Sequence, residues 1–374
     1  MMLAMNRIGP HGRLAVLGAM GLAAVLLGAC HNKSTSPIGT KGLWIANGPN
    51  VLEYIPKQLG TGTSAAVPHL AINSAVFGAP QGVTFDAKGN LWVMDPQSKV
   101  VAGAMTPALF EFSPAQLAAL ATNSMPEPVA IITSTALAFP QQSVFDAQGN
   151  QWVTDHNNNT VLVFTAAQLA MTGANDLNPA VVISSADLNG PLGIAFDSAN
   201  DLWIANNGGN NGGAAGTTIV EFTAATLPAP PATGMLTPML TPEVTLTDDG
   251  KDSIQAPWEL AFDSSGNLWS SNSAATFSLV RFAKASLAMT GTPTPAVTIN
   301  SMTVAGNATL SATNGLCLDD AGSVAATSSA APFGTAYYTM SQLMTGTPTP
   351  NTFFVGTATT LNAVAGCNFG PNVN

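Results

Sequence analysis

Six polar residues recur in this sequence at equivalent places, each directly after a short apolar segment, and together they could contact a ligand. They are Asn47, Asp95, Asp155, Asn206, Asn272 and Ser328. A ring of six such side chains would line the mouth of a channel. Asn and Asp also satisfy backbone N–H groups at turns without any ligand. We favour this structural role because turn capping by itself explains the repetition.

A second set of residues precedes another group of short apolar segments. Its members read Gln81, Gln141, Leu192, Trp258, Asn314 and Asn362, and the acid Glu259 stands beside Trp258. Glu259 occupies a place where the pattern usually has Gly, which makes the fifth repeat the special one. We expect any ligand to use the mouth formed by this set, in which the polar or aromatic candidates are Gln81, Gln141, Trp258, Glu259, Asn314 and Asn362.

Residues for acid–base catalysis are scarce. Beyond residue 29 the histidines are His31, His69 and His156. His156 follows Asp155 and could reach a channel mouth, but a general base needs a partner and none can be assigned. We therefore interpret His156 as a loop residue. The acidic run at 248–252 lacks the spacing of a calcium-binding loop and predicts a solvated turn.

The elements that position these residues come from a repeated string, which reads GVTFDAKGNLWVMD at 82–95. Clear copies lie at 145–152, 196–203 and 262–269, with a degenerate copy at 318–324. Each copy carries an Asp at a predicted turn, and such a period is typical of repeat architectures. One Trp falls on the same predicted strand of five units, as packing between neighbouring units would select. These residues are Trp44, Trp92, Trp152, Trp203 and Trp269.

Each unit contains four short β segments, with a short helix predicted between the third and fourth. Complete units are predicted at 80–132, 140–183, 191–246, 257–299 and 313–355, whereas 43–72 lacks its first strand. Residues 362–365 supply that missing strand. The sequence thus predicts an all-β fold, a six-bladed β-propeller over 42–374 with split-blade closure by the two ends of the chain. A seven-bladed ring, with a blade hidden in 206–256, is the alternative.

The repeated pattern resembles the NHL repeat and the related propellers of the gluconolactonase and streptogramin-lyase groups. In lactonase relatives an acid, an Asn and an Asp near the channel hold a divalent cation, and Gln81, Gln141 and Asn314 stand at comparable positions here without any carboxylate. Hard cations need charged oxygen ligands, so we expect no metal and no cofactor. The lyases would require His and Glu together in the channel. The resemblance implies the fold and leaves the function open.

Residues 1–29 have the pattern of a secretory signal, with Arg7 and Arg13 before an apolar stretch. The ending Leu27-Gly28-Ala29-Cys30 resembles the lipobox of bacterial lipoproteins, which implies a lipid on Cys30. His31 rather than Asp follows the Cys, and this resemblance implies sorting to the outer membrane, facing the periplasm or the cell surface. Residues 30–41 then form the lipidated Cys and a polar tether about 35 Å long at most.

The chain carries a formal charge of −10, and removal of residues 1–29 would make it more negative. This charge gives no electrostatic reason to bind nucleic acid. Cys317 and Cys367 fall on neighbouring predicted blades at different heights, and their spacing leaves a disulfide between them open. We expect a monomeric, membrane-anchored binding or scaffold module of the cell envelope, with an unknown protein, small-molecule or glycan ligand. A gluconolactonase-like or streptogramin-lyase-like enzyme with a rearranged channel is the alternative.

Overall fold

The computed structural model describes residues 39–373 except 61, 65, 102, 210–214, 275, 332, 344–347 and 356–359. The described residues form six β-sheets of four or five strands, which we call blades 1 to 6, and one separate two-stranded sheet. Blade 1 contains β28 (Val364–Gly370), β1 (Gly42–Asn47), β2 (Asn50–Tyr54) and β4 (Leu70–Ile72). Blade 2 contains β5 (Gly82–Phe85), β6 (Leu91–Ser98), β7 (Thr106–Phe112), β8 (Ala130–Thr133) and β12 (Gly173–Asp176). Blade 3 contains β9 (Pro140–Phe145), β10 (Gln151–Asp155), β11 (Thr160–Phe164) and β13 (Val181–Ser184).

The other three blades follow in chain order. Blade 4 contains β14 (Pro191–Phe196), β15 (Leu202–Gly208), β16 (Ala215–Phe222) and β17 (Val244–Thr247). Blade 5 contains β18 (Pro257–Phe262), β19 (Leu268–Asn272), β20 (Ser278–Phe282) and β21 (Val297–Asn300), followed by the small hairpin β22 (Thr303–Val304) and β23 (Asn307–Ala308). Blade 6 contains β24 (Thr313–Leu318), β25 (Val324–Ser328), β26 (Gly334–Tyr338), β27 (Thr352–Val355) and β3 (Thr63–Ser64).

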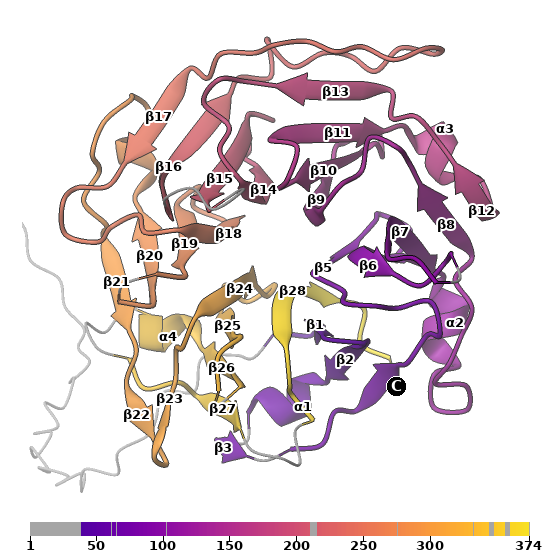
Figure 1. Cartoon of the computed structure of the whole chain (residues 1–374). Coiled ribbons are helices and arrows are strands. Elements are labelled where there is room, and N and C mark those ends of the chain that lie inside the picture. The colour runs from indigo at the N-terminus through magenta and orange to yellow at the C-terminus, as the bar shows by residue number, and fades with distance from the viewer. Residues whose placement is uncertain are drawn as a thin grey trace, which may run out of the picture. The chain divides into compact units, whose positions relative to one another are not determined.

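The blades stand around a common axis, and the two ends of the chain close the ring (Figure 1). The C-terminal strand β28 pairs antiparallel with β1, and Cys367 lies opposite Ile45. The six-bladed propeller with split-blade closure is therefore confirmed. The closing strand itself begins later than predicted, at Val364 instead of residue 362.

The hydrophobic core consists of six separate clusters, each of which lies between two neighbouring blades. The repeated Trp packs in these interfaces, and in four of them it contacts the Phe at the end of the innermost strand of the next blade. Trp269 packs in a cluster with Leu318, which stands at the place of that Phe. Trp152 and Phe196, for example, meet edge to face at 5.5 Å between ring centroids. Equivalent pairs have their centroids 5.8–6.2 Å apart. The predicted role of the Trp residues in packing is thus confirmed, and such pairs contribute about 0.5–1.5 kcal/mol each beyond area burial.

The Asp of each repeat shapes the turn between the first two strands of its blade. Asp86 Oδ1 accepts hydrogen bonds from Lys88 N and Asn90 N, both at 2.9 Å. The same two bonds, to the residues two and four positions later, recur in four other copies. This Asx-type geometry explains why the repeat requires Asp at that position.

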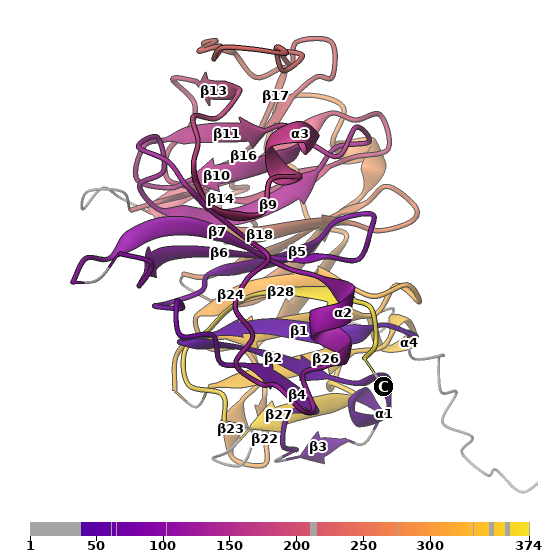
Figure 2. The same ribbon diagram turned by 90° about the vertical axis from the view of Figure 1, so that its right-hand side faces the viewer.

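Short helices connect the third and fourth strands, and they gather toward one side of the ring (Figure 2). They are α1 (Pro56–Leu59), α2 (Pro114–Ala118), α3 (Ala166–Leu169), the 3₁₀ helix η2 (Lys284–Ser286) and α4 (Met340–Leu343). The helix predicted at 223–227 forms a turn instead. Pro228 follows directly, and the residue before a proline is disfavoured in the helical region.

Connecting segments cover the outer edges of several blades. The segment from blade 3 adds β12 parallel to β8 of blade 2, and the segment from blade 1 adds β3 parallel to β27 of blade 6. Leu236 and Gly291 make parallel bridges to β13 and β17. An open sheet edge invites pairing with other chains, and these segments remove that hazard. Among the described residues, no helix is both long and apolar enough to cross a bilayer.

Candidate functional site

The six polar residues lie in the last part of the second strand of each blade, and all are buried, at most 1% exposed. Each accepts a hydrogen bond from the loop that leads into the first strand of its own blade. Asp95, for example, accepts from Gly78 N at 2.7 Å and from Ala79 N at 3.1 Å. Equivalent bonds occur at Asn47, Asp155, Asn206, Asn272 and Ser328. The side chains of this set therefore hold these loops in place.

The innermost strands of the six blades come closest to the axis one residue after the predicted mouth positions. At that level four blades carry glycine, blade 3 carries Gln142 and blade 5 carries Glu259. The glycines are Gly82, Gly193, Gly315 and Gly366. Asn362 belongs to no strand, because Val364 pairs with Asn47 as Thr313 pairs with Ser328. Ala365 thus takes the place of Asn314 in blade 1, and the prediction of Asn362 at the channel mouth is wrong.

Close contact between blades leaves room only for glycine at these four positions. A Cβ atom on Gly82 would lie 2.1 Å from Gln141 O, and one on Gly315 would lie 2.6 Å from Ala365 O. Both distances are far below van der Waals contact. The backbone N–H of Gly366 also donates to Gln81 O at 2.7 Å, which joins blade 1 to blade 2.

Hydroxyl groups on the second strand tie blade to blade at the same level. Thr154 Oγ1 donates to Leu192 O at 2.6 Å, and Ser271 Oγ donates to Asn314 O at 2.7 Å. Thr327 Oγ1 likewise donates to Ala365 O. These bonds satisfy the carbonyl groups of Leu192, Asn314 and Ala365 on the innermost strands. Asn314 therefore contributes to the assembly of the ring through its backbone carbonyl group.

The side chain of Glu259 extends from blade 5 to the place where blades 6 and 1 meet and close the ring. Its Oε2 accepts a hydrogen bond from Leu316 N of blade 6 at 2.6 Å, and Cys367 N of blade 1 also donates to the carboxyl group. Burial raises the pKa of Glu259 well above its usual range, and the two backbone donors offset only part of this effect. Burial therefore favours the neutral, protonated form of this side chain.

Gln142 approaches the axis from blade 3. Its side chain is 4% exposed and lies against Gly82 of blade 2 and Gly366 of blade 1. Its Nε2 has no hydrogen-bond partner among the described residues. Such an orphaned buried donor normally costs about 1–3 kcal/mol. Gln142 was not among the predicted mouth residues, although it replaces the usual Gly of the repeat as Glu259 does and this departure is visible in the sequence.

Glu259 and Gln142 face a cavity of about 240 Å³ at the axis. The innermost strands of all six blades line this axial cavity, which also receives Thr84, Ser143 and Asn368. Of the predicted mouth residues, only Glu259 reaches it. The side chains of Gln141 and Asn314 are buried one position earlier, and Gln81 donates to Ala79 O at 3.3 Å. Within the described residues, no three His, Cys, Asp or Glu side chains are arranged to hold a metal ion.

The sulfur atoms of Cys317 and Cys367 are bonded, and their Cα atoms are 5.9 Å apart. The sequence left this disulfide open because the predicted register placed the two residues at different heights. The later start of β28 brings Cys367 level with Leu316, next to Cys317. The disulfide joins blade 6 to blade 1 and lines the axial cavity.

His156 lies away from the axial cavity. Its ring packs against Gly190, where an added Cβ would lie 2.7 Å from His156 Cε1, and burial lowers its pKa. In the run at 248–252, Asp248 accepts from Ile254 N at 3.0 Å and from Gly250 N at 3.0 Å. Both features have the structural roles that the sequence predicted.

No model of a protein family matches this sequence, and no curated protein matches it. Among solved structures, a chain of a nidogen/laminin complex is similar, with a TM-score of 0.52 and 12% identity over 88% of this chain and 98% of that chain. The periplasmic gluconolactonase of Pseudomonas aeruginosa has a TM-score of 0.44 and 12% identity over 80% of this chain and 78% of its own. Virginiamycin B lyase of Staphylococcus aureus has a TM-score of 0.40 and 13% identity over 70% of this chain and 67% of its own. The first similarity supports the propeller fold.

Proposed function

We propose that this protein is a binding module of the bacterial cell envelope that holds a small uncharged polar molecule in the axial cavity. The observation that carries this proposal is the pair of Glu259 and Gln142. They stand at the position of the innermost strand where the other four blades, as described, have glycine. Gln142 Nε2 is a buried donor without a partner in the described part of the chain. A ligand that accepts a hydrogen bond there would relieve that cost.

The chemistry of the cavity favours a neutral ligand. Burial favours the protonated form of Glu259, in which the carboxyl group offers one O–H donor besides its acceptor oxygens. Thr84 adds a hydroxyl group, which can donate and accept, whereas Ser143 Oγ already donates to Met94 Sδ and accepts from Gln151 Nε2. Hydroxyl and amide groups of a small sugar or amide fit this set. An ionised ligand would have to lose its hydration without a counter-charge.

Titration calorimetry of the purified protein against a panel of neutral sugars and small amides tests the proposal. We expect Gln142→Leu to weaken binding at least tenfold because it removes the free donor. Gln141→Leu is the matched control, since Gln141 is equally buried but does not line the cavity. Equal loss of affinity in both variants, or tighter binding of charged analogues, would overturn the proposal.

A hydrolase or lyase with a rearranged site is the second candidate, and Glu259 is the observation that favours it. Burial raises the pKa of Glu259, and a carboxyl group with a raised pKa can act as a general acid. Turnover of a lactone or glycan by the purified protein, abolished by Glu259→Ala, would support the enzyme and exclude a purely binding role. This candidate also predicts a bound divalent metal, which elemental analysis without chelators would detect.

The lipoprotein interpretation belongs to the same proposal, and residues 1–38 lie outside the described residues. The motif that ends at Cys30 supports a lipid anchor, which would hold the monomeric ring near the outer membrane. Cys30→Ser should move the protein from the membrane fraction to the soluble fraction and remove the lipid mass. A protein that fractionates unchanged would contradict the anchor.

A further inference from the structure

The outer edge of blade 3 shows how this fold covers an exposed strand. Leu236, in the connection of blade 4, donates its N–H to Ala180 O at 2.9 Å and accepts from Val182 N at 2.8 Å. Two residues later, Ser184 N donates to Pro238 O at 3.1 Å. One extended segment thus occupies the outer edge of β13 in parallel orientation.

Blade 1 has the same edge but lacks this cover. His69 N donates to Glu53 O as Ala180 N donates to Val163 O, so that His69 and Ala71 correspond to Ala180 and Val182. Asn73 N donates to Ser124 O at 2.8 Å, which matches the bond of Ser184. No residue of the described chain bonds to His69 O or Ala71 N on this outer side.

The reason is a turn in the connection of blade 2. Thr122 occupies the place that corresponds to Leu236, but its N–H donates to Ala119 O at 3.0 Å and its hydroxyl donates to the same oxygen at 2.9 Å. The chain therefore folds back onto the end of α2 before it reaches Ser124. As a result, no residue in the described part of the chain covers the strand edge at Ala71.

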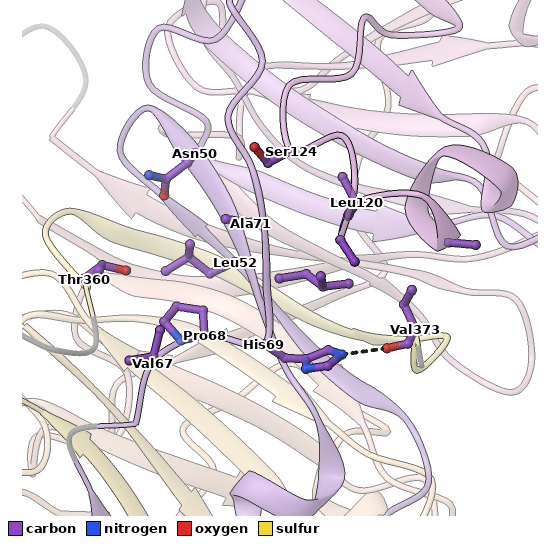
Figure 3. A pocket seen from close by; sticks show the side chains of 13 residues that line it. Asn50, Leu52, Val67, Pro68, His69, Ala71, Leu120, Ser124, Thr360 and Val373 are labelled. Carbon is purple, nitrogen blue, oxygen red and sulfur yellow. Dashed lines mark hydrogen bonds between the residues drawn. The ribbon is translucent and has the colours of Figure 1, made fainter.

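A groove of about 620 Å³ lies beside this uncovered edge. Leu52 and Pro68 of blade 1 stand to one side, and Leu120 and Ser124 of the blade 2 connection stand to the other (Figure 3). His69 Nε2 contacts Val373 O at 3.0 Å at one end. The groove is thus lined mainly by apolar side chains, and the backbone groups His69 O and Ala71 N lie along it.

We propose that this groove binds an extended peptide segment of a partner protein, which pairs in parallel with β4. The segments seated on blades 2, 3, 4 and 6 are the grounds for this occupant, because each is extended and runs parallel to the outermost strand. One peptide residue would donate to His69 O and accept from Ala71 N. Strand addition of this kind takes its affinity from main-chain bonds and its specificity from alternate side chains.

The spacing of side chains along a β-strand determines which peptide residues can enter the groove. Alternate side chains of a strand project to the same face, about 6.5 Å apart. Side chains that enter the groove between Leu52 and Leu120 must therefore be apolar and alternate with outward-facing residues. A proline cannot stand at the paired position, because that residue must donate its N–H.

A displayed library of random octapeptides, selected on the purified protein, tests the proposal. Enriched peptides are synthesised, and their affinities are measured for the wild type and three variants. Ala71→Pro removes the outward N–H, and Ala121→Trp fills the groove that Ala121 lines. Ala119→Trp is the matched control, since Ala119 is exposed in the same segment but does not line the groove.

We expect the first two variants to weaken binding at least tenfold and the control to stay within twofold. Backbone amide exchange at Ala71 should slow when peptide is added. Failure to enrich any peptide, or peptides that bind Ala121→Trp as well as the wild type, would overturn the proposal. Self-association of the protein that Ala121→Trp abolishes would overturn it as well, since the groove would then hold a second copy.

Discussion

Glu259 shows how one buried carboxyl group links ring assembly to pH. Its carboxyl group accepts hydrogen bonds from two backbone N–H groups, one from each of the two blades that meet at the closure. The protonated form is favoured by burial, while the unfolded chain ionises at the ordinary pKa of a glutamic acid. The folded state therefore binds more protons than the unfolded state as soon as the pH exceeds that ordinary value.

From this linkage we expect the stability of the wild type to fall as the pH rises from about 4.5 toward the raised pKa of Glu259. Glu259→Gln keeps an acceptor for Leu316 N but cannot ionise, so its stability should change less over the same range. Urea unfolding at pH 5 and pH 8 measures both proteins. Parallel pH profiles would show that Glu259 does not carry this linkage.

Two substitutions of Glu259 distinguish its contribution to packing from its contribution to hydrogen bonding. Glu259→Leu keeps most of the volume but leaves the N–H groups of Leu316 and Cys367 without their acceptor. Each orphaned group costs about 1–3 kcal/mol, so we expect Glu259→Leu to be less stable than Glu259→Gln at pH 5. Equal unfolding midpoints of the two variants would contradict the hydrogen-bonding role.

At the scale of elements, the turn Asp determines whether the first two strands of a blade pair. Asp146 accepts from Gln148 N and Asn150 N at 2.9 Å each, and its Oδ2 accepts from Trp152 Nε1 at 2.9 Å. One side chain thus fixes the turn and orients the Trp that packs between blades.

We expect Asp146→Ala to lower the free energy of unfolding by about 2 kcal/mol, as the loss of a capping residue does. Asp187→Ala is the control, because Asp187 is exposed in a loop, and such substitutions usually stay within about 0.5 kcal/mol. Chemical unfolding of both variants measures the difference. A loss at Asp146 no larger than that of the control would refute the role of the turn.

At the scale of the whole molecule, stability depends on closing the ring. β28 pairs with β1, and the disulfide between Cys317 and Cys367 crosses the same closure. Trp44 Nε1 donates to Pro371 O at 3.3 Å, and Val373 N donates to Glu53 Oε1 at 3.0 Å. The last residues of the chain are therefore bound from β1, β2 and blade 6.

Reduction of the disulfide, or Cys317→Ser, should lower the free energy of unfolding by about 2–4 kcal/mol. The sequence separation of 50 residues places the bridge in the range where loop closure matters. Reductant added to the Cys317→Ser variant is the control and should have no further effect. Unfolding that is insensitive to reductant in the wild type would contradict the bridge.

Deletion of residues 360–374 should abolish cooperative unfolding, because β1 loses its inner neighbour and blade 1 becomes an open edge. Scanning calorimetry and gel filtration of the truncated protein measure this outcome. A soluble monomer with unchanged melting behaviour would show that the C-terminal strand does not close the ring.

The sequence alone determined the blades, because each blade is built from local signals. The Asp and Gly of the turn, the alternating apolar segments and the Trp all act within one repeat, so their spacing is visible in the chain. The repeat count also predicted that the two ends share a blade. Such local patterns do not depend on how distant segments align.

Only the tertiary structure decided the register of the closing strand, since β28 has no turn that joins it to β1. That register makes Ala365 rather than Asn362 the inner residue and brings Cys317 to Cys367. The packing of blades around the axis also brings the side chain of Gln142 against Gly82 and Gly366. These contacts join residues that are far apart in the sequence, and their geometry follows from the packing of all six blades around one axis.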